Sequence, residues 1–177
     1  MLTATAAEAN NVIWQRKVEE LFLDHYQFMY RTAKGVIGHS EDAEDVVQNL
    51  FLKLVQHEPR QEFRKNPKGY LHRAVVNEAL NMIRSHRRRS ETDGVEELEI
   101  PEPGSGRSND NIRNTLLDTF SNLKPHVVEI LILHYEHGYS DADIAELLGQ
   151  SRSKIASILS RTRAQLRKTV GRNHDAT

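Results

Sequence analysis

"SDADIAELLGQSRSKIASILSR", residues 140–161, decides the fold class of the second half of this chain. Ser140 and Asp143 have the spacing of a capping box, in which two side chains and two backbone N–H groups bond reciprocally at a helix start. Gly149 can supply the left-handed geometry that ends the helix. Ser151 is then placed to cap a second helix. The stretch therefore predicts two short helices joined by a tight turn.

The second of these helices has an apolar face and a polar face. Ile155, Ile158 and Leu159 would pack inward, and the outer face carries Arg152, Ser153, Lys154, Ser157 and Arg161. The second helix of a helix-turn-helix can enter the major groove with its first turns facing base edges. The alternative is an ordinary helical hairpin with a solvated basic face. The absence of any acid from Gln150 to Arg172 favours the DNA-binding interpretation.

Charge is strongly segregated along the 177 residues, although the formal net charge is only −1. Residues 84–89, "RSHRRR", are basic, whereas residues 90–103, "SETDGVEELEIPEP", contain six acids and no base. Two cationic segments separated by an acidic one indicate a protein that touches an anionic polymer at two places.

Several function classes are excluded or disfavoured by composition. The chain has no cysteine, which excludes disulfides and thiolate-bound zinc. No apolar run approaches the roughly 20 residues that span a bilayer, and the start, "MLTATAAEANN", lacks the pattern of a secretory signal. We therefore expect no membrane insertion and a cytoplasmic location. No phosphate-binding loop, nucleophile elbow or metalloprotease motif occurs, so we expect no enzyme, no catalytic residue and no cofactor.

Two polar groups raise the alternative of a metal site. The first contains Asp42, Glu44, Asp45, Gln48 and Asn49, and the second is the pair His134 and His137. The helix dipole already explains early acids on a helix, and neither group has further ligands nearby in sequence. We expect a protein-binding face for the first group, packing or dipole contacts for the second, and no metal.

Helical periodicity runs through the whole chain and predicts an all-α fold. Helices are expected over 11–36, 41–56 with Ser40 as cap, 67–89, 112–123 and 125–138, followed by the pair in 140–161. Residues 90–110, acidic and interrupted by Pro101 and Pro103, are expected to form a flexible linker. The predicted architecture is two small helical domains, 11–89 and 111–170, with tails at 1–10 and 171–177.

The segment from Phe63 to Arg84 mixes aromatic, cationic and amide side chains. Exposed bases of single strands stack on aromatic rings, and cations follow their backbone. This pattern therefore suits single-stranded nucleic acid. The alternative is that Phe63 and Tyr70 belong to the core and that the other side chains are ordinary surface.

Three stretches together resemble the extracytoplasmic-function (ECF) group of bacterial RNA polymerase sigma factors. They are "DAEDVVQNLFLKL" at 42–54, "GYLHRAVVNEALNMIRSHRRR" at 69–89 and "LLGQSRSKIASILSRTRAQLRK" at 147–168. The first is the most specific, because many regulators share a helix-turn-helix. With "LFLDHYQFMYRTA" at 21–33, the resemblance covers most of residues 18–169.

The resemblance implies three binding interfaces and no catalytic site. Core RNA polymerase would bind through its β′ clamp helices to Asp42, Asp45, Gln48, Asn49 and Leu52, and through its β flap to the C-terminal domain. The −10 promoter element would be held by Phe63, Arg64, Lys65, Asn66, Tyr70, Arg73, Asn77, Asn81 and Arg84. The −35 element would be read by Arg152, Ser153, Lys154, Ser157 and Arg161. An anti-sigma factor covering the polymerase-binding faces is also expected.

Two alternative functions remain open from the sequence. The first is a stand-alone helix-turn-helix regulator that binds a palindrome as a dimer. The second is a sigma-like decoy that sequesters an anti-sigma factor without touching DNA. The two cationic patches argue against the decoy, and the low net charge argues against a protein that holds DNA unaided.

Overall fold

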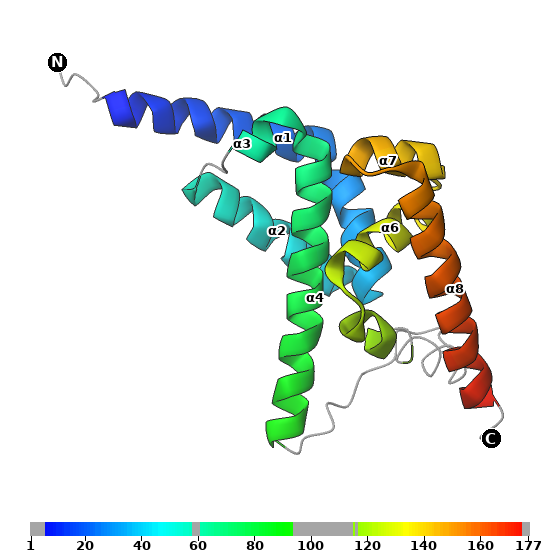
Figure 1. Ribbon diagram of the computed structural model, residues 1–177. Coiled ribbons are helices and arrows are strands. Elements are labelled where there is room, and N and C mark those ends of the chain that lie inside the picture. Colours follow the sequence, from blue (N-terminus) through cyan, green and yellow to red (C-terminus); the bar gives the residue numbers. More distant parts are fainter. Residues whose placement is uncertain (1–5, 58–60, 94–114, 116, 175–177) are drawn as a thin grey trace.

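A computed structural model describes residues 6–57, 61–93, 115 and 117–174, and these residues form helices and short connections (Figure 1). The helices are α1 (Ala6–Ile37), α2 (Ser40–Gln56), α3 (Gln61–Lys65), α4 (Pro67–Asp93), α6 (Pro125–Tyr135), α7 (Asp141–Leu148) and α8 (Arg152–His174). Residues 117–122 are also helical. The described part of the chain contains no strand, which confirms the predicted all-α class.

Three helices, α1, α2 and α4, surround the core of the first module. Their apolar stripes bury Met29, Val47 and Leu71 completely. Trp14 joins two elements that are distant in sequence, because its indole Nε1 donates a hydrogen bond of 2.5 Å to the Leu54 carbonyl oxygen. Burial of these side chains away from water supplies the main stabilisation of the module.

Several helix ends differ from the predicted ones. α1 begins at Ala6, inside the expected N-terminal tail, α4 continues to Asp93, inside the expected linker, and α8 continues to His174. Ser40 does not cap α2: the helix begins at Ser40 itself, and His39 is the extended residue before it. The Ser40 hydroxyl instead accepts a hydrogen bond of 3.0 Å from Lys34 Nζ. The rest of the predicted acidic linker lies outside the described residues.

The helix-turn-helix forms as the sequence predicts. Ser140 Oγ accepts a bond of 3.2 Å from the Asp143 N–H, and an Asp143 carboxylate oxygen accepts one of 3.0 Å from the Ser140 N–H. Gly149 ends α7 with φ of 63°, in the left-handed region where glycine has no steric penalty. Ser151 Oγ accepts from the Lys154 N–H at the start of α8. Ile144 and Ile155 are fully buried between the two helices.

The two modules are in contact. Figure 1 shows α6 lying between α4 and α8, and α6 also contacts α1. Val128 and Ile132 of α6 belong to the same buried cluster as the core of α1, α2 and α4. The domains that the sequence predicts as separate units therefore share part of a core.

Among the described helices, none combines the length and apolar character that crossing a bilayer requires.

Candidate polymerase and nucleic-acid interfaces

The expected polymerase-binding face lies along α2. Its opposite face is buried in the core, through Val46, Val47, Leu50, Phe51 and Leu54. The outer face carries Asp42, Asp45, Gln48, Asn49 and Leu52, of which Asp42 is half-buried and the others are exposed. Leu52 is 59% exposed, and Val55, one turn away, is 36% exposed. Exposed aliphatic side chains framed by polar groups are typical of a protein-binding surface.

Phe63, expected among the residues that contact the −10 element, is a core residue in this structure. Its side chain is fully buried, and its ring makes edge contacts with Trp14 at 5.6 Å and Tyr70 at 5.3 Å between centroids. The backbone of α3 directs this ring inward, beneath the N-terminal half of α1. Tyr70 is half-buried by the same contact. We therefore remove Phe63 from the DNA-facing set.

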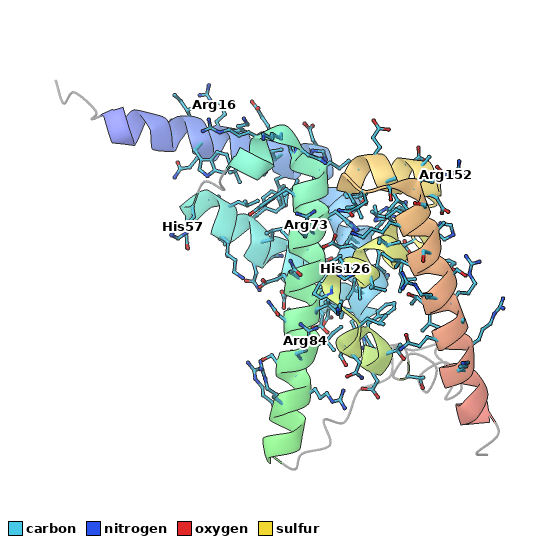
Figure 2. The ribbon with its side chains drawn as sticks, viewed as in Figure 1. Arg16, His57, Arg73, Arg84, His126 and Arg152 are labelled. Atoms are coloured by element: carbon cyan, nitrogen blue, oxygen red, sulfur yellow. The ribbon has the colours of Figure 1, made fainter. Side chains whose placement is uncertain are left out.

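The other residues expected at the −10 element divide into two groups. Arg64, Lys65, Asn77 and Asn81 are exposed on the first module. The second group, Asn66, Arg73 and Arg84, makes contacts with the second module; Asn66 and Arg84 are half-buried, and Arg73 stays exposed. Figure 2 labels Arg73 and Arg84, which follow one another along α4.

Each member of the second group has a defined partner. Asn66 Nδ2 donates a hydrogen bond of 2.7 Å to the Leu147 carbonyl oxygen at the end of α7. Arg73 Nε lies 3.6 Å from a carboxylate oxygen of Glu129 in α6. Burial raises the pKa of Glu129, and Arg73 opposes this rise. Arg84 Nη2 donates to the Ser121 carbonyl oxygen at 3.3 Å. The second module therefore occupies part of the surface expected to bind DNA.

A buried polar cluster lies at the contact between the modules. Thr32 Oγ1 of α1 lies 3.3 Å from His72 Nδ1 and 2.8 Å from His137 Nε2. His72 Nε2 lies 3.1 Å from the Glu129 carbonyl oxygen. Because a carbonyl oxygen only accepts, neutral His72 carries its proton on Nε2 and leaves Nδ1 as an acceptor.

Both histidines are held in their neutral form. The pKa of His72 is lowered from 6.5 to about 4, mainly by burial; the bond to the Glu129 carbonyl oxygen opposes this shift, and nearby His137, Arg73 and Lys68 add to it. Burial likewise lowers the pKa of His137 to about 4. The His137 ring packs against Phe28, with 4.3 Å between centroids. These contacts agree with the packing interpretation of His137.

The residues expected to read the −35 element are exposed at the start of α8. Arg152, Ser153, Lys154, Ser157 and Arg161 lie on the outer face, whereas Ile155, Ile158 and Leu159 are buried. Lys154 Nζ bonds to Gln150 Oε1 at 2.6 Å, and Arg161 Nε bonds to the Ser157 carbonyl oxygen at 3.2 Å. Figure 2 shows Arg152 at the start of α8, on the side away from α4. This face is therefore open to a groove.

Other groups singled out in the sequence have structural partners. His134 Nδ1 lies 3.2 Å from the Tyr139 carbonyl oxygen and 3.9 Å from an Asp141 carboxylate oxygen. Within the described ranges, no three His, Cys, Asp or Glu side chains are placed to hold a metal ion.

Sequence reasoning missed the inter-module residues Thr32, His72 and Glu129. Glu129 offers a signal, because it is the one acid within the apolar run "VVEILIL" at 127–133. A buried carboxylate needs a cationic or hydrogen-bonding partner. Such a residue therefore indicates a specific contact, although the sequence does not identify the partner.

Comparisons with known proteins agree on one family. The model of sigma-70 region 2 matches residues 21–89, and that of sigma-70 region 4 matches residues 113–166. The chain is 27% identical to the ECF RNA polymerase sigma factor SigE of Mycolicibacterium smegmatis, over 98% of this chain and 68% of the relative. It is 28% identical to SigM of Mycobacterium tuberculosis, over 86% and 76% of the two chains.

A solved structure shares the fold. It is the sigma factor RpoE of Bartonella quintana in complex with the anti-sigma factor NepR, with a TM-score of 0.50 and 23% identity, over 88% of this chain and 98% of that one. The two module matches, the relatives and the α2 and α8 faces described above all lead to one assignment. The chain belongs to the ECF group of RNA polymerase sigma factors.

Proposed function

We propose that this sigma factor binds core RNA polymerase through the outer face of α2, with the domain at 11–89 directed to the −10 element and the domain at 111–170 to the −35 element. One observation carries the proposal: α2 and α8 each bury an apolar face and expose the residues expected to bind polymerase or DNA. Two binding faces on two modules suit a subunit that positions a larger enzyme at two promoter elements.

Polymerase recognition would centre on Leu52 of α2. Its exposed side chain follows the exposed polar residues Asp45, Gln48 and Asn49 along the same helix. Burying an apolar centre under a polar rim is the common anatomy of protein interfaces. The β′ clamp helices are the expected partner of this face, and the β flap is the expected partner of the second module.

Promoter opening would use the exposed amides and cations of the first module. Asn77 and Asn81 are one turn apart on α4, and Arg64 and Lys65 end α3. Taking a base out of the stack costs a few kcal/mol, which contacts to the extruded base offset. Strand separation is thus driven by binding, and this chain acts as an initiation factor with no covalent step of its own.

Recognition of the −35 element would place the start of α8 in the major groove. Helices of this motif read bases with their first turns. Arg152 and Lys154 stand there, while Arg161 lies further along the helix and nearer to phosphates. The net charge of −1 is compatible with this role, because polymerase would supply much of the phosphate contact in the complex.

A regulatory partner is part of the proposal. The sigma factor of Bartonella quintana with the same fold was solved with the anti-sigma factor NepR. We infer that a protein of that functional class binds this chain over its polymerase-binding faces. Since transcription takes place in the bacterial cytoplasm, we also place the protein there.

In vitro transcription with purified core polymerase tests the proposal. Promoter-specific transcripts are expected from some fragments of a genomic library, with no transcripts when either core polymerase or this protein is omitted. The free protein is expected to give no specific gel shift of the same fragments. A strong shift without polymerase would favour the stand-alone regulator, and binding of an anti-sigma factor without any transcription would favour the decoy.

A further inference from the structure

Glu78 is unusual for its place in the sequence. It is the one acid among residues 63–90, a segment that contains eight lysines and arginines. It follows Asn77 directly and precedes Asn81 by three positions, and both of these exposed amides are assigned above to the −10 element. Residues three apart on a helix are neighbours on its surface. A negative charge therefore lies within a surface that is expected to hold a polyanion.

The Glu78 carboxylate is held by a cation from another helix. Lys53 Nζ of α2 donates to the two carboxylate oxygens at 2.8 and 2.7 Å. The Lys53 side chain is 61% exposed and the Glu78 side chain is 23% exposed. Ion pairs at the surface add little to stability, because water solvates both charges and the two side chains lose entropy when they are ordered. Stability alone is therefore a weak reason for this pair.

The pair keeps hydrogen-bonding capacity beyond its own contact. A carboxylate offers about four acceptor sites and an ammonium has three donors. The contact uses one site on each Glu78 oxygen and two N–H groups of Lys53. The carboxylate can therefore still accept from a nucleotide base, and the ammonium can still donate to a phosphate oxygen.

A carboxylate accepts hydrogen bonds and donates none, and this divides the four bases of DNA. Adenine, cytosine and guanine each carry an exocyclic amine, and acidic side chains accept from such amines, as they do from cytosine N4. Thymine carries the acceptor O4 where cytosine carries its amine. Two acceptors that face each other both stay without a partner, which costs free energy. A carboxylate therefore selects against thymine.

We propose that Glu78, oriented by Lys53, is a specificity-determining residue of the −10-facing surface and rejects thymine at one position of the opened strand. This inference rests on the proposed function and adds two residues to it. The Glu78 carboxylate accepts from the amine of the base, and Lys53 fixes the carboxylate and donates its third N–H to a phosphate. Because the two charges of the pair cancel, the contact selects among bases and adds little to the general attraction for DNA.

Transcription by the full-length protein with core polymerase tests the selection. The templates differ only in the −10 element, where each position carries each of the four bases in turn. The quantity measured is the ratio of transcription from the thymine template to that from the best amino-bearing base. The wild-type ratio is expected to be about one fifth or less at one position, the lower end of discrimination by a base contact.

Glu78→Gln is expected to bring this ratio to within about twofold of unity, because an amide can donate to thymine as well as accept from an amine. Glu20→Gln, on the exposed side of α1, is the matched control and should keep the wild-type ratio.

A charge exchange separates selection of a base from packing of the two helices. The double variant Lys53→Glu, Glu78→Lys keeps an ion pair between α2 and α4 but places the donor on α4. Thymine is expected to become at least as good as the amino-bearing bases at the same position, because its O4 accepts from an ammonium. Each ratio comes from one protein, so a change in polymerase binding next to Leu52 cancels.

Two results would overturn the proposal. One is an unchanged thymine ratio in Glu78→Gln at every −10 position. The other is a return of the wild-type ratio in the charge exchange, which would leave the pair as a structural link between α2 and α4.

A wild-type protein that gives no transcripts would instead defeat the proposed function. The selection is then measured by the fluorescence anisotropy of labelled oligocytidine and oligothymidine strands with the full-length protein. A preference for cytidine that Glu78→Gln abolishes would support it, and equal affinity of the wild-type protein for the two strands would overturn it.

Discussion

The two surfaces assigned to DNA differ in what the rest of the chain does with them. At the start of α8, Lys154 and Arg161 bond to Gln150 and Ser157, within the helix or the turn before it. On the first module, Asn66, Arg73 and Arg84 bond instead to residues of the other module. The α8 residues therefore keep their bonds within their own module, whereas part of the first-module surface is in contact with the other module. Charge and residue type alone do not separate these two cases.

The largest effect is expected at Phe63. Contact between its ring and DNA would contradict the comparison most directly, because the ring is buried in the core of the first module. Phe63→Ala should reduce the free energy of unfolding by about 3 to 5 kcal/mol, since it removes a large side chain from a filled core. Urea denaturation followed by circular dichroism measures this change.

The exposed neighbour of Phe63 provides the control. Lys65→Ala should change the free energy of unfolding by about 0.5 kcal/mol or less, as for most surface substitutions. A small effect of Phe63→Ala, together with a large loss of strand binding in a stably folded protein, would return Phe63 to the DNA-facing set.

Acid should reduce the difference between the two surfaces by weakening the contact between the modules. This contact holds His72 and His137 neutral, each with a pKa of about 4, whereas an exposed histidine has a pKa near 6.5. As the pH falls, protons therefore bind first to molecules in which the modules are apart. The stabilisation from this contact is complete above about pH 6.5 and is lost progressively between pH 6.5 and pH 4.

The loss at pH 5 is about 2 kcal/mol for buried His72 and less for half-buried His137. Arg31 and Lys68 around the pair also disfavour its protonation, whereas Glu136 opposes them at His137. Energy transfer between dyes on the two modules, followed from pH 7.5 to pH 4.5, measures their separation directly. His72→Gln should flatten the profile, and a flat wild-type profile would contradict the assignment.

The open surface on α8 should respond to mutation in a sequence-dependent way. Arg152→Ala or Lys154→Ala should cost about 1 to 3 kcal/mol of promoter binding by the polymerase complex and relax the preference at one −35 position. Transcription from a set of single-base variants of the −35 element measures this. Uniform weakening across the set would assign the side chain to phosphate contact.

The smallest effect is expected at the rim of the polymerase-binding face. Asp45→Lys should weaken binding to core polymerase by about 1 kcal/mol, mainly through slower association, as is usual for rim charges. Competition with a labelled sigma factor measures this affinity. Asp24→Lys on exposed α1 is the control, and equal affinities for Asp45→Lys and wild type would remove α2 from the interface.

Local signals in the sequence predicted the helices and the turn of the second module well. The capping box at Ser140 and the left-handed Gly149 depend only on residues a few positions apart, and both are confirmed. Ser40 shows the limit of such reasoning, because a hydroxyl near a helix start can bond to Lys34 instead of the backbone.

The contact between the modules was not predictable from local pattern. Arg73 and Glu129 are 56 positions apart, and neither has a feature that names the other. The burial of Phe63 was not predictable for a related reason. An aromatic residue beside Arg64 and Lys65 suits base stacking, and only the position of Trp14 in space shows that the ring is buried.

Asn66 combines a contact between the modules with a cap on its own helix. Its Oδ1 accepts the Gly69 N–H at 2.9 Å and so caps α4, while its Nδ2 holds the Leu147 carbonyl oxygen. Departure of α7 would free the amide hydrogens and leave the cap intact. The side chain would then keep its orientation, so that no part of α4 would have to refold before the amide donates to a nucleotide.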